Sequence, residues 1–195
     1  MKTNVYDDVA ASTATSRPRG AEKSGSTDQD FDQEEIMKKL QAAGTPGAAH
    51  KALDAFAGNW KAEVKCWMEQ DAQPIVTHGM ARTGWILGGR FLEEEFRGEM
   101  MGQPFTGRCL LGFDNTQQKF KSVWVDDKNT AMVTSEGTAD SGYKVITLEG
   151  RSDCPATGQK NISMKQVFRV HNPDEIVLEM FHDGAKRMEI TYTRQ

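Results

Sequence analysis

The sequence contains no run of about 18 apolar residues, so it predicts no membrane-spanning helix. The opening MKTNVYDDVAAS has two aspartates where a secretory signal peptide needs an apolar core, and we expect a cytoplasmic protein. The net charge is only −4 over 195 residues, with no excess of basic groups. Because nucleic acids and anionic membranes attract basic surfaces, we expect neither as a partner.

Reactive and metal-binding residues are also scarce. The three cysteines, Cys66, Cys109 and Cys154, include no C-x-x-C pair, which is typical of a reducing compartment and argues against a structural zinc site. None of the four histidines lies two or four residues from another, so the spacing predicts no metal site. Glycine-rich phosphate loops, H-E-x-x-H and G-x-S-x-G are absent, and the sequence assigns neither a cofactor nor an enzyme class.

Composition divides the chain into three parts. Residues 1–31 lack Leu, Ile and Trp, so they cannot bury enough apolar surface to offset the entropy of ordering, and we expect a disordered tail. Residues 32–57 read as a helical lead-in. Its first helix, 32–43, has Asp32 and Glu35 at capping spacing, and a second short helix covers 48–56 before Gly58 ends it.

From residue 58 onward apolar and polar residues alternate with period two, which is typical of half-buried strands. The turn signals between the runs are short, so consecutive strands should be antiparallel neighbours. The predicted strands are 60–68, 74–87, 90–100, 104–114, 119–126, 130–138, 143–150, 161–170, 175–182 and 187–194.

About ten antiparallel strands in a row leave two unpaired edges unless the sheet closes on itself. Glycines inside the predicted strands, such as Gly79, Gly107 and Gly137, permit the bends that closure needs. We therefore predict a mainly β fold over residues 58–195, a closed antiparallel up-and-down barrel, with a two-sheet sandwich as the alternative.

Several ordered segments resemble a known bacterial family. AHKALDAFAGNW, WILGGRFLEEEFRGEMMGQPFTG, LLGFDNTQQKF, VWVDD and the closing MEITYTR are similar to the family called domain of unknown function (DUF) 1579, over about residues 48–195. The resemblance implies a lipocalin-like, calycin-type barrel and no defined activity.

The start of the first predicted strand has a further likeness. Gly58-Asn59-Trp60 resembles the G-x-W of lipocalin-type barrels, in which the Trp plugs the closed end and an Arg from the last strand lies across its ring. Arg194 is at the corresponding place. The resemblance thus implies a structural plug of Trp60 and Arg194, held by a cation–π contact.

Carboxylates are the most suggestive candidates for a site. Glu94 lies between Leu92 and Phe96 at period two, and Glu179 lies between Val177 and Phe181 in the same way. If both face inward they need a cationic partner, such as Arg82, Arg90 or Lys165, or a ligand. The opposite strand parity, with both carboxylates exposed, is the alternative.

Further candidates complete the ligand-binding set that we expect within the barrel. Aromatic and methionine side chains would give an adaptable apolar interior. We expect a small apolar or amphipathic ligand. Haem or gas-ligand binding through His182 or His171, by analogy with nitrobindin-like barrels, is an alternative, as are catalysis by an inward carboxylate and a purely interacting protein. The candidate ligand-binding residues are His78, Arg82, Arg90, Glu94, Trp124, Glu179 and His182.

Overall fold

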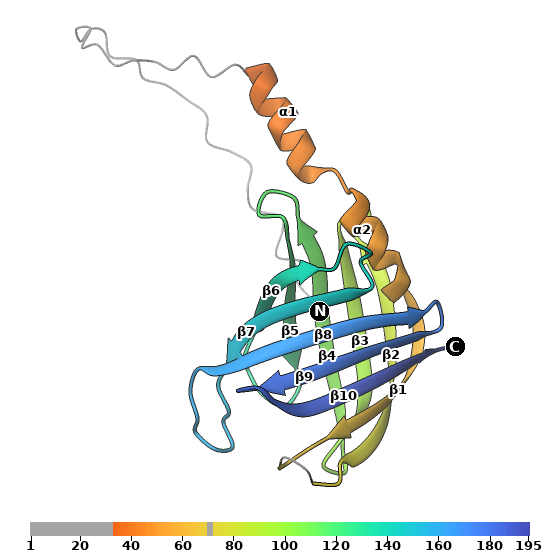
Figure 1. The fold of residues 1–195 in the computed structure, drawn as a ribbon, viewed down its shortest axis with the longest axis vertical. Helices are drawn as coiled ribbons and strands as arrows, with labels where there is room; N and C mark the ends of the chain where they lie inside the picture. Colours follow the sequence, from red (N-terminus) through yellow and green to blue (C-terminus); the bar gives the residue numbers. More distant parts are fainter. Residues whose placement is uncertain (1–32, 70–71) are drawn as a thin grey trace, which may run out of the picture. The chain divides into compact units, whose positions relative to one another are not determined.

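The computed structural model describes residues 33–69 and 72–195. Within them the chain forms two α-helices, one 3₁₀ helix and ten strands, drawn in Figure 1. The expected tail 1–31 and the capping residue Asp32 lie outside the described residues. The helices are α1 (Gln33–Gly44), α2 (Ala48–Ala52) and η1 (Leu53–Phe56). The strands are β1 (Gly58–Cys66), β2 (Ile75–Ile86), β3 (Phe91–Met100), β4 (Gln103–Asp114), β5 (Lys119–Asp126), β6 (Val133–Ala139), β7 (Val145–Ser152), β8 (Ile162–Asn172), β9 (Glu175–His182) and β10 (Ala185–Arg194).

The ten strands form a closed antiparallel barrel in which every strand pairs with its neighbours in the chain. Closure comes from β1 and β10, where Trp60 pairs with Arg194 and Cys66 with Met188. The predicted up-and-down barrel is confirmed, and the sandwich alternative is wrong. Because β1 and β10 bond to each other, neither is left as an exposed edge.

Glycine permits close packing between neighbouring strands of the barrel. A Cβ on Gly137 would collide with the backbone carbonyl of Thr147, and a Cβ on Gly107 would collide with the ring of Trp124. Because Gly107 has no side chain, the indole of Trp124 on β5 can pack directly against the backbone of β4. A side chain at either position would therefore collide with the neighbouring strand, which explains why both residues are glycine.

The interior is filled by alternate residues of the strands. In β1 the buried residues Trp60, Ala62 and Val64 point inward, and in β9 Ile176 and Leu178 do the same. The core is mostly aliphatic and aromatic. It nevertheless includes a few buried polar side chains, which are the starting point for the site.

The helical lead-in closes one end of the barrel. Ala49 and Leu53 are buried in the core, together with Phe56, and Figure 1 shows α2 over this end. α1 has no buried residue. Its last turn is held by Asn115, whose Nδ2 donates to the carbonyl oxygens of Ala43 and Thr45 at 3.0 and 2.7 Å. No helix in the described part of the chain is long and apolar enough to cross a membrane.

Candidate functional site

The strand parity of β3 places Glu94 inside the barrel. Leu92 and Phe96, which flank it at period two, are 1% and 6% exposed. The hydroxyl of Thr83 on β2 donates to Glu94 Oε2 at 3.4 Å, and Tyr192 on β10 also bonds to this carboxyl group. Glu94 is thus the centre of a small polar group in an apolar interior, and three strands supply it.

Burial controls the protonation of this group. It raises the pKa of Glu94 to about 7, although the hydrogen bonds from Thr83 and Tyr192 favour the charged form. The pKa of Tyr192 is raised by burial and by the nearby charge of Glu94, and burial likewise raises the pKa of Cys109. In the described part of the chain no ion pair joins Glu94 to a basic side chain. The carboxyl group therefore changes charge near neutral pH with no cation to compensate it.

A small cavity borders Glu94. Its volume is about 20 Å³, enough for one group the size of a water molecule. Two pairs of rings meet edge to face around it, Phe56 with Phe168 at 5.7 Å and Trp60 with Tyr192 at 6.5 Å between centroids. The lining residues are Phe56, Trp60, Glu94, Phe168, Ile176 and Tyr192.

A second polar cluster lies on strands β5, β6 and β8. The hydroxyls of Ser122 and Ser135 are 2.7 Å apart, and Ser135 also donates to Gln166 Oε1 at 3.0 Å. All three side chains are buried. Buried polar groups are normally paired, as these are, so the cluster is satisfied within the protein and is a weaker ligand site than Glu94.

The end of the barrel away from η1 is less tightly filled. Trp124 and His182 point inward there and are half-buried, as are Met180 and Met188. The indole N–H of Trp124 donates to Asp126 at 3.0 Å, and burial lowers the pKa of His182. Two of the predicted site residues thus line the interior, in the same barrel as Glu94.

Glu179 faces outward, so the expectation of an inward carboxylate at this position is wrong. Its inward neighbours are Leu178 and Met180, and its carboxylate pairs with Lys186 at 2.9 Å and with Arg169 at 3.1 Å. The hydrogen bond from Lys186 is the main reason that the pKa of Glu179 is lowered. This carboxylate is part of a surface ion network and does not face the cavity.

The remaining candidates do not join Glu94. His78 and Arg82 are exposed on the outer face of β2, where His78 Nε2 lies 3.9 Å from Glu63. Arg90 is exposed in the β2–β3 turn, and its guanidinium donates to the carbonyls of Leu87 and Gly88. His171 is exposed as well. The inward carboxylate therefore has none of the arginine partners that the sequence suggests for it.

Trp60 and Arg194 lie at the closed end. Trp60 is 2% exposed, and the Arg194 guanidinium carbon lies 4.1 Å from the centre of its ring. Arg194 also donates to the carbonyls of Ala57 at 2.8 Å and Ala55 at 3.1 Å. This arginine therefore ties the last strand to η1 and to the residue after it, while the Trp60 indole N–H donates to the carbonyl oxygen of Phe56.

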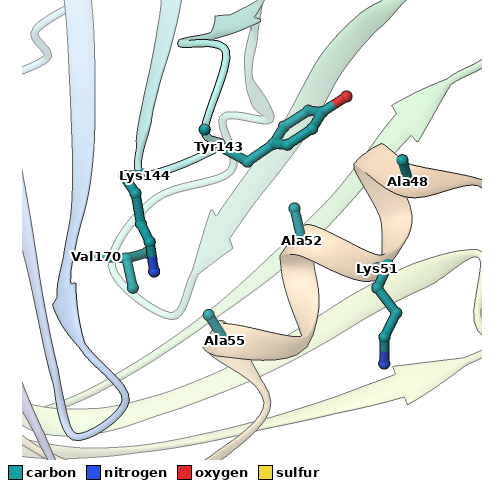
Figure 2. Close-up of a pocket in the computed structure, with 8 residues that line it drawn as sticks. Ala48, Lys51, Ala52, Ala55, Tyr143, Lys144 and Val170 are labelled. Atoms are coloured by element: carbon teal, nitrogen blue, oxygen red, sulfur yellow. The ribbon is translucent and has the colours of Figure 1, made fainter.

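An open groove of about 310 Å³ lies on the outside, between α2 and the β6–β7 turn. Figure 2 shows Ala52 and Ala55 on the helix side, and Tyr143 and Lys144 on the other. Lys51 also lines it, but its ammonium group pairs with Asp54 at 2.7 Å. With small apolar walls and no buried polar group, the groove is a weaker candidate than the cavity beside Glu94.

Strand alternation indicates the inward side of Glu94 but not its hydrogen-bond partners. Thr83 and Tyr192 are 11 and 98 residues away from it along the chain. Alternation in the last strand does place Tyr192 on the same side as Ile190. Only closure of the barrel through the β1–β10 pairing brings that side against β3, and no local pattern contains this information.

Comparison with family models identifies the chain. The model described as "Protein of unknown function (DUF1579)" matches residues 45–194, about three quarters of the sequence. The chain belongs to this family. The matched residues include every strand of the barrel and the helices α2 and η1. A comparison with curated proteins finds no match.

One of three similar solved structures supports the fold. Rv2717c from M. tuberculosis, in a crystal structure, is 17% identical with a TM-score of 0.56, covering 77% of this chain and 99% of that one. A designed fluorescence-activating β-barrel is 12% identical with a TM-score of 0.43, covering 74% and 97% of the two chains. The redesigned barrel mFAP1, bound to DFHBI, is 15% identical with a TM-score of 0.36, covering 76% and 100%. At such identities the likeness to Rv2717c shows the fold alone.

Proposed function

We propose that this protein of the DUF1579 family binds a small organic molecule inside its barrel. The observation that carries the proposal is Glu94, a half-buried ionisable group on the inward face of β3, bordering a cavity and without a cationic partner in the described residues. Keeping such a group inside costs stability. An apolar lining with a few polar groups is typical of ligand sites, where those groups orient the ligand.

The remainder of the interior suits a ligand larger than the cavity. Met164, Met180 and Met188 point into the barrel. Methionine side chains are unbranched and change shape at little cost, so they can repack around an organic molecule. Side chains at the end away from η1 are half-buried, and we expect the ligand to enter there.

The test is to isolate the full chain from its expression host at low salt and measure its mass under native and denaturing conditions. We expect a small organic molecule that stays with the folded protein and is released on unfolding. If the purified protein carries no bound molecule, a library of small organic molecules is screened for binding by NMR. If the protein carries no such molecule and no member of the library perturbs the resonances of Glu94, Trp60 or Tyr192, the proposal is wrong.

Proton transfer is a second candidate function, favoured by the pKa of about 7 for Glu94. A general base works best when its pKa is near the working pH. A molecule identified in the first experiment is incubated with the protein in D₂O. Catalysis is supported if wild type exchanges a carbon-bound hydrogen of the molecule for deuterium and Glu94→Gln does not. If the molecule binds to wild type without exchange, the protein binds it but does not catalyse proton transfer.

A further inference from the structure

The cavity beside Glu94 combines aromatic walls with a carboxyl group. Four of its six lining residues are aromatic: Phe56, Trp60, Phe168 and Tyr192. They come from η1, β1, β8 and β10, so the walls depend on both the lead-in and the closed barrel. Aromatic rings attract cations through the negative charge on their faces, and this attraction increases where water is excluded.

The walls are held in place before any ligand arrives. The Trp60 indole N–H donates to the Phe56 carbonyl at 2.9 Å, which joins one wall to the next. Trp60 is 2% and Tyr192 7% exposed, so neither ring has room to swing out. A preformed site of this kind loses little conformational entropy on binding.

The charge around the cavity favours a cation as well. Glu94 accepts hydrogen bonds from Thr83 and Tyr192, which are neutral groups, and Cys109 is its other ionisable neighbour. The cation Arg194 lies over Trp60, but its N–H groups bond to Ala55, Ala57 and Pro173, and Asp174 lies 3.5 Å from its Nε. The ionised carboxylate therefore has no counter-ion among these neighbours.

We propose that this cavity takes the ammonium group of a small organic amine, with Glu94 as its counter-ion and the four rings as its walls. The inference rests on the proposed function and names the ligand class for that site. A volume of about 20 Å³ admits one ammonium or methyl group. The remainder of the amine needs further room, which repacking of the adaptable methionine side chains of the interior would supply.

An amine is preferred to an alcohol of the same length for a definite reason. An alcohol offers a hydrogen bond but leaves the carboxylate charge uncompensated beside a mostly aromatic wall. An ammonium group supplies the hydrogen bond and the opposite charge together, which makes the bond stronger. Ammonium binding should therefore increase with the ionised fraction of Glu94, whereas alcohol binding should not.

Ethylammonium and ethanol are the matched probes, titrated into the full chain and followed by the ¹³C shift of the Glu94 carboxyl group. With a pKa near 7, Glu94 is about one tenth ionised at pH 6 and about nine tenths at pH 8. We expect ethylammonium to bind about tenfold more tightly at pH 8 than at pH 6, and to lower the pKa of Glu94. At pH 8 ethanol should bind more weakly than ethylammonium does, and its affinity should not increase between pH 6 and pH 8.

Two variants separate the site from general charge effects. Glu94→Gln keeps the size and the hydrogen-bond acceptor but removes the charge, and it should abolish the pH-dependent part of ethylammonium binding. Glu93→Gln makes the same change on the outer face of β3, where Glu93 pairs with Arg108 at 3.0 Å. It should bind ethylammonium as wild type does. Unfolding curves of both variants establish that they are folded at the pH of each titration.

The outcomes distinguish this inference from the proposed function. If ethanol binds at this cavity and ethylammonium does not, or if ethylammonium binds equally well to Glu94→Gln, the cation assignment is wrong while the binding function stands. If neither probe binds and the screen of small organic molecules also perturbs nothing around Glu94, both are wrong.

Discussion

At the scale of single residues, Glu94 links stability to pH. Its pKa rises from 4.5 to about 7 on folding, so the folded state holds the proton more tightly than the unfolded state does. This favours folding fully below pH 4.5, and the contribution is lost as the pH rises through about 7. A difference of this size corresponds to about 3 kcal/mol.

Glu94→Gln, which stays neutral, should remove this dependence. We expect its free energy of unfolding, measured in urea, to gain about 2–3 kcal/mol relative to wild type between pH 5 and pH 8. Taking the difference at each pH cancels the titration of groups common to both proteins. A difference that stays constant over this range would mean that Glu94 is ionised in the folded state throughout.

His182 is the inward histidine that a haem hypothesis would need, since His171 is exposed. A histidine that holds iron normally donates its other ring N–H to a second group that fixes its orientation. No hydrogen bond joins the His182 imidazole to another described residue, and the nearby charges are Arg187 and Asp183. We therefore expect added hemin to give no Soret shift that His182→Ala removes; such a shift would favour the haem alternative.

At the scale of secondary structure, the two carboxylates show where sequence reasoning succeeds and fails. In β3 the residues at Leu92 and Phe96 are apolar on one face while Glu93 and Glu95 are charged on the other, so alternation indicates the inward side. β9 has apolar residues on both faces. Phe181 is outward there, with the Lys165 ammonium 4.8 Å from its ring. Alternation in such a strand does not indicate which face is inward, and the expectation that Glu179 faces inward is wrong.

Arg194 joins three elements, and its removal should loosen the closed end. Arg194→Ala would leave the carbonyls of Ala55 and Ala57 without their charged donor, which should cost about 2–3 kcal/mol in the free energy of unfolding. Trp60→Ala removes a buried indole and should cost about 3–5 kcal/mol. Since the two side chains touch, the double variant should lose less than the sum.

Arg97→Ala is the matched control for this experiment. Its guanidinium is 74% exposed on the outer face of β3 and pairs with Glu95. An exposed pair of this kind contributes about 0–1 kcal/mol. If Arg194→Ala costs no more than Arg97→Ala, Arg194 does not hold η1 to the last strand.

At the scale of the whole molecule, the barrel could be predicted but the cavity could not. Strand number and order follow from short turns and period-two alternation along the chain, which are local signals. The cavity needs residues from six separate elements, η1, β1, β3, β8, β9 and β10. Their meeting depends on strand tilt and on how the lead-in packs over one end. Neither the strand tilt nor the packing of the lead-in can be predicted from a single sequence.

The contribution of the helical lead-in to stability can be measured with a series of N-terminal truncations. A chain that begins at residue 32 or at residue 46 keeps α2 and η1, and α1 buries no residue, so its melting temperature should fall by no more than about 4 °C. A chain that begins at Gly58 loses Leu53, which is 0% exposed, and Phe56, which is 8% exposed. Each such loss costs about 2–5 kcal/mol, so this chain should unfold at much lower temperature or fail to fold.

The truncations also separate the two roles of the lead-in. Removing Phe56 opens the cavity as well as weakening the core, so the shortest chain should lose ethylammonium binding even at a temperature where its strands remain folded by circular dichroism. The chain that begins at residue 46 should bind like the full chain. If it melts as early as the chain that begins at Gly58, α1 supports the barrel through contacts other than buried side chains, and the functional unit starts earlier than Pro46.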